Sequence, residues 1–126
     1  MSKYSETNFF KSFAYARRGL KLAIKSQRNF SRQICVAAIA IISAILLKFS
    51  VVEFCITIIL IGFVLFAELF NSVTEFLFDA VFKNRYSKLA EMAKDMEAGA
   101  VCITSFTAVT AGSVLFISKI IKFFGA

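Results

Sequence analysis

The sequence predicts an all-α integral membrane protein with an N-terminal surface helix and three transmembrane helices. Three observations lead to this prediction: 59% of the 126 residues are apolar, proline is absent, and charges are scarce over three long segments. A chain of this length and composition is expected to form one domain. We therefore expect residues 1–126 to form a single membrane domain.

Residues 1–32 are expected to lie on the cytoplasmic surface as an amphipathic helix. From Phe9 to Arg32, apolar side chains recur on one side at the helical period of about 100° per residue. Basic side chains line the other side: Arg18, Lys21, Lys25, Arg28 and Arg32. Anchoring to anionic lipid alone is one explanation of such a helix. Gln27 departs from the pattern because its amide projects with the apolar side chains, and Tyr15 lies on the flank between the two sides.

Residues 33–52 and 98–118 are predicted to be the first and third transmembrane helices. The first segment holds 20 residues with Lys48 as its one charge, and the other holds 21 residues without a charge. About 20 apolar residues in a helix cross the hydrocarbon core of a bilayer. Basic residues concentrate before the first span and between the second and third spans, so we expect both regions on the cytoplasmic side of the inner membrane.

The second span, residues 54–78, is predicted to carry polar side chains in its cytoplasmic half. Because the 14 residues between Glu53 and Glu68 are too few to cross the bilayer, the helix must take Glu68 and Asn71 into the membrane. We call the following set the acidic row: Glu68, Asn71, Glu75 and Asp79. Spacings of 3, 4 and 4 place the set on one helix face, within an arc of about 80°. The row is expected to run from the inner leaflet into the cytosol.

The acidic row requires an explanation, because a charged carboxylate costs about 2.5–3.5 kcal/mol at the bilayer centre. A polar zipper between helices is one alternative, and for Asn71 alone it is as good an explanation as a functional role. A proton or cation pathway is another, but the outer two thirds of the second span and the whole third span lack acidic and basic side chains. The row does offer hard oxygen ligands for Mg²⁺ at a depth where a lipid and a water-soluble anion can meet.

A second polar cluster precedes the third span, within the predicted cytoplasmic segment 79–97. In "KLAEMAKDMEAGAV", Lys94 offers a point charge to phosphate, and Asp95 can accept a hydrogen bond from a ribose or hold a metal. Solvation and capping near a helix start is the simpler explanation of this pair. The sequence contains no P-loop, GxGxxG, CxxC pair or histidine, so any ATP is held in another way and a zinc site is not expected.

With these motifs in view, the chain resembles the small bacterial diacylglycerol kinase family of integral membrane enzymes, which includes the undecaprenol kinases. "AELFNSVTE" followed by Asp79 matches the family pattern E-x-x-N-[ST]-x-x-E-x-x-x-D, and "AKDMEAGAV" matches A-K-D-x-x-[AS]-[AG]-A-V. "SFAYARRGLKLAIKSQRNF" is similar to the amphipathic helix of the family, and the resemblance covers roughly residues 8–120. It implies a homotrimer with sites shared between subunits.

The resemblance also implies roles for individual residues. Glu68 corresponds to the catalytic base that accepts the proton of the lipid hydroxyl, Asn71 to a residue that positions base or substrate, and Glu75 to a magnesium ligand. Nucleotide-binding roles are implied for a further set: Tyr15, Asp79, Tyr86, Lys94 and Asp95. Gln27 stands where many members have a second magnesium-binding glutamate, and its neutral amide is expected to weaken metal affinity.

The expected function is therefore an ATP- and Mg²⁺-dependent lipid kinase of the bacterial inner membrane that phosphorylates undecaprenol or diacylglycerol. The expected partners are the lipid alcohol, ATP, membrane lipids and further copies of the chain, and no nucleic acid. The alternative is a non-catalytic trimeric membrane adaptor of the same family, because position 27 holds a glutamine where many members have a glutamate. A small ion or proton transporter is a third hypothesis.

Overall fold

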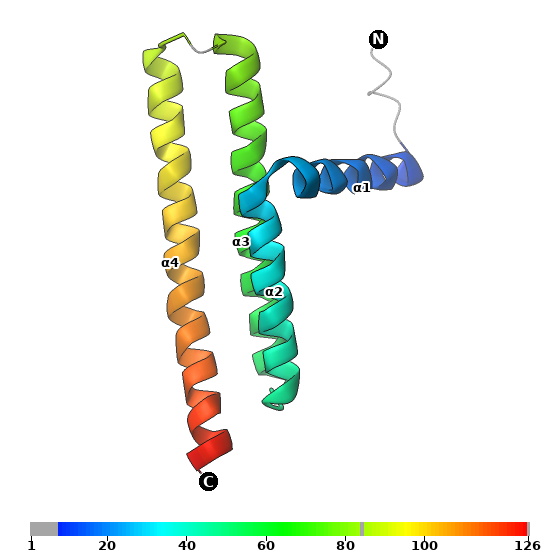
Figure 1. Ribbon diagram of the computed structural model, residues 1–126, viewed down its shortest axis with the longest axis vertical. Coiled ribbons are helices and arrows are strands. Elements are labelled where there is room, and N and C mark those ends of the chain that lie inside the picture. The colour runs from blue at the N-terminus through cyan, green and yellow to red at the C-terminus, as the bar shows by residue number, and fades with distance from the viewer. Residues whose placement is uncertain (1–7, 84, 126) are drawn as a thin grey trace.

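Four helices make up the protein, as a computed structural model of residues 8–83 and 85–125 shows (Figure 1). They are α1 (Phe9–Ser26), α2 (Arg28–Leu46), α3 (Val51–Phe82) and α4 (Lys88–Gly125). The described residues contain no strand, and the all-α prediction is confirmed. Residues 1–7 of the predicted surface segment, with Asn84 and Ala126, lie outside the described residues.

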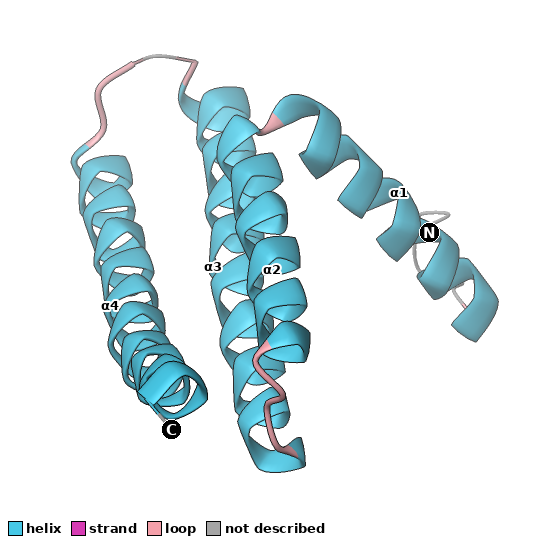
Figure 2. Cartoon of the chain, turned by 60° about the horizontal axis from the view of Figure 1, so that its bottom comes forward, coloured by secondary structure: helices cyan, strands magenta, loops and turns pink. Residues whose placement is uncertain are grey.

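Helices α2, α3 and α4 run alongside one another, whereas α1 extends sideways from them (Figures 1 and 2). Helix α3 is the central member, because it packs against α2 on one side and against α4 on another, while α1 contacts α2. Helices α2, α3 and α4 are each long and apolar enough to cross a membrane. The bundle therefore has the geometry of three spans with a fourth helix that projects sideways from the start of α2.

Local sequence signals explain where two of the helices begin and one ends. The Asn8 side chain accepts a hydrogen bond from the Lys11 N–H at 2.9 Å and caps α1. Ser50 and Glu53 form a reciprocal capping box at the start of α3, so two backbone N–H groups gain partners. Helix α3 ends at Lys83, whose left-handed backbone (φ 48°, ψ 48°) turns the chain toward α4.

The bend between α1 and α2 is formed by Gln27, whose backbone is extended (φ −118°, ψ 107°). We call it the elbow. The Ser31 hydroxyl donates to the carbonyl oxygen of Ile24 at 2.7 Å, which links α2 back to the last turn of α1. Ala23 and Phe30 are buried on either side of the bend. The surface helix predicted to continue to Arg32 ends instead at Ser26, and the buried Ala23 and Phe30 lie on the two sides of the break.

The helix bounds differ from the predicted spans: α2 ends at Leu46 rather than at residue 52, and residues 51–52 begin α3. Helix α2 begins at Arg28 rather than at residue 33, and α3 continues to Phe82. Helix α4 begins at Lys88, so the connection between α3 and α4 is far shorter than the predicted segment 79–97. Much of the polar sequence around both motifs is therefore helical, and the functional side chains stand on rigid elements rather than on a long loop.

The chain buries little of its own apolar surface. Among the described residues, the buried apolar side chains are Ala23, Phe30 and Ala44, while large apolar side chains are exposed along all four helices. A water-soluble monomer rarely leaves such a surface uncovered. In a bilayer, lipid tails cover it, and helix packing depends on close contact and hydrogen bonds instead.

Helices α3 and α4 are joined at the end opposite their connection. Lys119 Nζ lies 3.0 Å from Glu53 Oε1, and the rings of Phe49 and Phe116 pack with centroids 4.8 Å apart. The ion pair is partly shielded, with side chains 22% and 26% exposed. It therefore holds α4 against the first turn of α3.

Candidate functional site

The acidic row extends over about three of the last four turns of α3. Counting from Val51 at ~1.5 Å per residue, Glu68 lies ~26 Å along the helix, Glu75 ~36 Å and Asp79 ~42 Å. Helix α2 is ~28 Å long by the same measure and runs antiparallel to α3, so its first turn lies at about the height of Glu68. Figure 1 shows α3 continuing past the elbow. The row therefore begins beside the elbow and ends well beyond it.

Burial changes along the row. Glu68 and Asn71 are half-buried, whereas Glu75 and Asp79 are exposed. One helix face therefore offers two environments. Glu68 is a half-buried carboxylate beside the amide of Asn71, whereas the carboxylates nearer the end of α3 are exposed. The half-buried Glu68 is suited to accept or donate a proton. The exposed Glu75 and Asp79 are suited to contact a hydrated metal ion.

An apolar groove of about 260 Å³ leads toward the row between α2 and α4. We call it the midspan groove. Its floor on α3 includes Thr57, Ile61 and Val64. Glu68 follows Ile61 by seven residues and Val64 by four, so it projects from the same face of α3. The acidic row thus continues the side of α3 that faces the space between α2 and α4.

A second groove, of about 360 Å³, lies where α3 and α4 meet at their connection, and we call it the loop-end groove. It is lined by Phe78, Asp79 and Phe82 of α3, by Arg85, Tyr86 and Ser87 of the connection, and by Ala90, Glu91 and Lys94 of α4. It brings together three of the predicted nucleotide-binding residues, Asp79, Tyr86 and Lys94. Two motifs that are separated in the sequence therefore share one surface.

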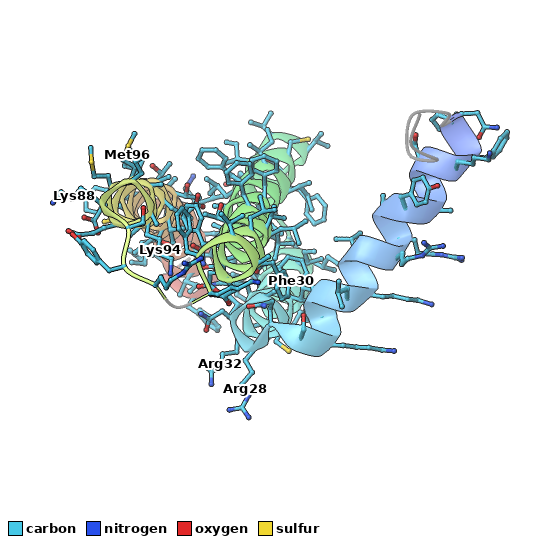
Figure 3. All side chains as sticks on the ribbon, turned by 90° about the horizontal axis from the view of Figure 1, so that it is seen from above. Arg28, Phe30, Arg32, Lys88, Lys94 and Met96 are labelled. Atoms are coloured by element: carbon cyan, nitrogen blue, oxygen red, sulfur yellow. The ribbon has the colours of Figure 1, made fainter. Side chains whose placement is uncertain are left out.

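Lys94 is directed at the loop-end groove by its position on α4. Its ammonium lies 5.8 Å from the centre of the Phe78 ring, a cation–π distance. Figure 3 shows Lys94 on the side of α4 that faces α3, whereas Lys88 and Met96 point away from α3. Within the described part of the chain Lys94 forms no salt bridge. Its charge is therefore available to an anion in the groove.

Tyr86 is oriented by Glu91 across the same groove. The Tyr86 hydroxyl donates to Glu91 Oε2 at 2.6 Å, and this hydrogen bond raises the pKa of Tyr86 above its ordinary value. Lys88 Nζ lies 3.7 Å from the other oxygen of Glu91. The tyrosine therefore stays protonated near neutral pH, with its ring at the rim of the groove.

Other predicted site residues are not brought to the loop-end groove within one chain. Tyr15 is half-buried on α1 beneath the Arg18 guanidinium, which lies 5.6 Å from the centre of its ring. It lies ~17 Å along α1 from Ser26, and α1 points away from the bundle. Gln27 is half-buried at the elbow, and Asp95 is exposed on α4.

Few side chains within one chain are placed to ligate a metal ion. Among the described residues, no group of three or more His, Cys, Asp or Glu side chains is close enough to hold a metal ion. The Glu75 carboxylate is exposed and forms no ion pair within that part of the chain. Mg²⁺ is commonly held by one or two carboxylates together with substrate phosphates and water. Glu75 therefore fits a metal that arrives with its nucleotide.

Several residues of the loop-end groove were missed by sequence reasoning. Phe78, Arg85 and Ser87 line it without having been assigned a role, and Glu91 had no expected partner. For Phe78 a signal existed, because it directly precedes Asp79 and lies four residues before Phe82. For Arg85 and Ser87 no sequence signal existed, because the path of the connection between α3 and α4 depends on the turn at Lys83.

Three helices of membrane-spanning length, a half-buried carboxylate on α3 and a groove with charged side chains of both signs at one end are features of a small multi-pass membrane protein with a polar site. The profile of the prokaryotic diacylglycerol kinase family matches residues 14–116, and the chain belongs to that family. It is thus a lipid kinase of the membrane.

Two characterised relatives support the family assignment. The chain is 34% identical over 112 residues to the undecaprenol kinase of Bacillus subtilis, covering 89% of this chain and 90% of that protein. It is 31% identical over 115 residues to a diacylglycerol kinase of Synechocystis sp., covering 91% of this chain and 66% of that protein. The names of these two relatives give different lipid substrates.

Proposed function

We propose that the protein uses ATP and Mg²⁺ to phosphorylate a long-chain lipid alcohol, undecaprenol or diacylglycerol, at the inner leaflet of the bacterial inner membrane. The observation that carries the proposal is the position of two features on one face of α3. The half-buried Glu68 lies beside the elbow, and the loop-end groove with Asp79 and Lys94 lies ~16 Å further along. A lipid hydroxyl and a nucleotide can approach each other along this face.

Phosphoryl transfer asks mainly for positioning and neutralisation of charge. The oxygen of the lipid hydroxyl attacks the γ-phosphorus of ATP, its proton passes to the Glu68 carboxylate, and the bond from phosphorus to the ADP oxygen breaks. Asn71, one turn from Glu68, orients the hydroxyl or the base. Lys94 holds phosphate, and Asp79, Tyr86 and Asp95 contact the rest of the nucleotide.

Glu75 is the residue that would hold Mg²⁺, with the neutral Gln27 as a second oxygen ligand. The bound ion supplies positive charge that offsets the charge of the phosphates. Because α1 carries Tyr15 away from the loop-end groove of its own chain, and Gln27 lies at the elbow and does not line that groove, we propose that both residues contribute to the site of a neighbouring subunit in a homotrimer.

The orientation that fits this chemistry places the N-terminus and the connection between α3 and α4 in the cytosol. The basic side of α1 supports this proposal, because its charges would lie at the anionic surface. Arg28 and Arg32 point away from the helices at this end (Figure 3). The membrane boundaries at residues 33–52, 54–78 and 98–118 stay predictions.

Glu68→Gln tests the proposed base. Removing the proton acceptor while keeping the shape should lower kcat for lipid phosphorylation by about 10²- to 10⁴-fold. The measurement is ATP-dependent phosphorylation of undecaprenol and of diacylglycerol in mixed micelles, with and without Mg²⁺. Glu53→Gln is the matched control, because this carboxylate lies at the other end of α3, and it should keep kcat. Equal activity of Glu68→Gln and wild type would contradict the role of Glu68.

A further inference from the structure

A polar contact joins α3 to α4 one turn before the loop-end groove. The Thr74 hydroxyl lies 3.1 Å from Glu97 Oε2 and 3.0 Å from the carbonyl oxygen of Phe70 on its own helix. Thr74 and Glu97 are both half-buried. The hydroxyl has one proton to share between these acceptors, and the charged carboxylate is the stronger acceptor. The contact is therefore a bridge between helices, which we call the Thr74–Glu97 bridge.

The bridge fixes the antiparallel register of the two helices near the groove. Within the described part of the chain, side-chain hydrogen bonds join α3 to α4 at two places, Glu53 with Lys119 and Thr74 with Glu97. Four residues beyond Thr74 is Phe78, and three residues before Glu97 is Lys94, whose ammonium lies over the Phe78 ring. A shift of one helix along the other would therefore break the bridge and displace Lys94.

Both partners of the bridge occupy positions that the two family patterns leave open. Thr74 occupies the variable position directly before Glu75 in the first family pattern, and Glu97 occupies the variable position two residues after Asp95 in the second. Neither side chain belongs to the set of functional residues that the resemblance implies. The two side chains nevertheless stand beside that set, one on each helix.

We propose that Thr74 and Glu97 are positioning residues that hold Lys94 of α4 at a fixed height against the acidic row of α3. This inference rests on the proposed function. Glu97 acts as a hydrogen-bond acceptor and contacts neither substrate nor metal. Without the bridge, Lys94 shifts relative to the acidic row, and the nucleotide binds more weakly. The lipid hydroxyl at Glu68, deeper along α3, is unaffected.

The test compares Thr74→Val, Glu97→Ala and the double variant with the wild type in detergent micelles. Calorimetric titration with Mg²⁺ and a non-hydrolysable ATP analogue gives nucleotide affinity, and turnover gives KM for ATP and for lipid. Each single variant should weaken nucleotide binding and raise KM for ATP roughly 3- to 20-fold, with KM for lipid unchanged. The double variant should be no worse than either single one, because both changes remove the same bond.

Two further variants separate positioning from other roles. Glu97→Gln keeps an amide oxygen that accepts from Thr74, so its nucleotide affinity should stay within about twofold of wild type. Thr104→Val removes a hydroxyl that donates to the Ala100 carbonyl within α4, and it should also match wild type. A loss in Glu97→Gln as large as that in Glu97→Ala would overturn the inference, because the charge itself would then be the active feature. An equal loss in Thr104→Val would overturn it as well.

The outcomes distinguish this inference from the proposed function. A wild type that neither binds nucleotide nor phosphorylates lipid would overturn the proposed function and the inference with it. An active wild type whose affinity for nucleotide is unchanged in both Thr74→Val and Glu97→Ala would overturn the inference alone. If Thr74→Val does not fold, Glu97→Ala decides the question, with Thr74→Ser expected to retain wild-type affinity.

Discussion

Gln27 forms the elbow, and it is also the residue that we propose as a second oxygen ligand of Mg²⁺. Its extended backbone is a conformation that glutamine and glutamate adopt equally well. Its side chain is half-buried and carries an oxygen ligand without charge. The residue can therefore be changed to a carboxylate without disturbing the bend.

Gln27→Glu should lower the Mg²⁺ concentration for half-maximal activity about 3- to 30-fold, because a charged oxygen ligand replaces a neutral one. The measurement is turnover over a Mg²⁺ titration at saturating ATP and lipid. Asn29→Asp is the control, since it adds the same charge two residues along α2 at an exposed position. An unchanged Mg²⁺ dependence in Gln27→Glu would show that this side chain does not reach the metal.

At the scale of elements, the pair of α3 and α4 is held by polar contacts near both ends. The Glu53–Lys119 ion pair closes the end near Ser50, and the Thr74–Glu97 bridge lies near the connection. Between them the pairing rests on apolar and small side chains. Each polar contact therefore contributes to the alignment of helices that bury little apolar surface.

Lys119→Met should lower the free energy of unfolding, because Glu53 loses its ionic partner on α4. Unfolding in mixed micelles with increasing dodecyl sulfate, followed by circular dichroism, measures this change. Lys122→Met is the matched control: Lys122 lies one turn along α4 and has no salt bridge within the described part of the chain. Equal destabilisation by both variants would assign the effect to general charge rather than to the pair.

Hydropathy and helical period predicted the four helices, but not where the elbow lies. The apolar pattern of α1 continues through Ala23 to Phe30, and the polar side chain of Gln27 within it does not by itself predict a break in the helix. Proline is absent from the chain, and no glycine lies at the bend. The bend arises because Ala23 and Phe30 bury against the bundle, which is a tertiary effect that one helix's sequence does not contain.

The candidate site was predictable where its residues share one helix. Spacing alone placed the acidic row on one face of α3, and composition alone placed Lys94 near the end of a span. The loop-end groove was not predictable, because the approach of Tyr86 and Phe78 to Lys94 depends on a left-handed turn at Lys83. A lysine is not a usual residue for that conformation, so the residue type at position 83 did not predict the turn.

For the molecule as a whole, two features bear on assembly: the exposed apolar surface and the separation of the proposed site residues within one chain. The midspan groove is open between α2 and α4, and α1 extends away from its own bundle. Further copies of the chain can cover apolar surface and bring α1 to a neighbouring site. Both features agree with the proposed homotrimer.

The purified protein in mild detergent should have a protein mass of three 14.0 kDa chains. Size-exclusion chromatography with light scattering, corrected for bound detergent, measures this mass. Glutaraldehyde treatment in native membranes should give a ladder that ends at three chains. A single-chain mass in detergent together with no cross-linked species in membranes would contradict the proposed assembly.

The connection between α2 and α3 is a turn of four residues, Leu47–Ser50, whereas the polar row and both motifs lie toward the opposite end. The proposed catalytic and nucleotide-binding residues on α3 and α4 thus face one leaflet in the proposed orientation. Under the proposed function, a lipid alcohol whose hydroxyl lies in the other leaflet is out of reach of Glu68. Phosphorylation of such a molecule must wait until it has flipped across the bilayer, so lipid translocation sets an upper limit on the rate at which that pool is used.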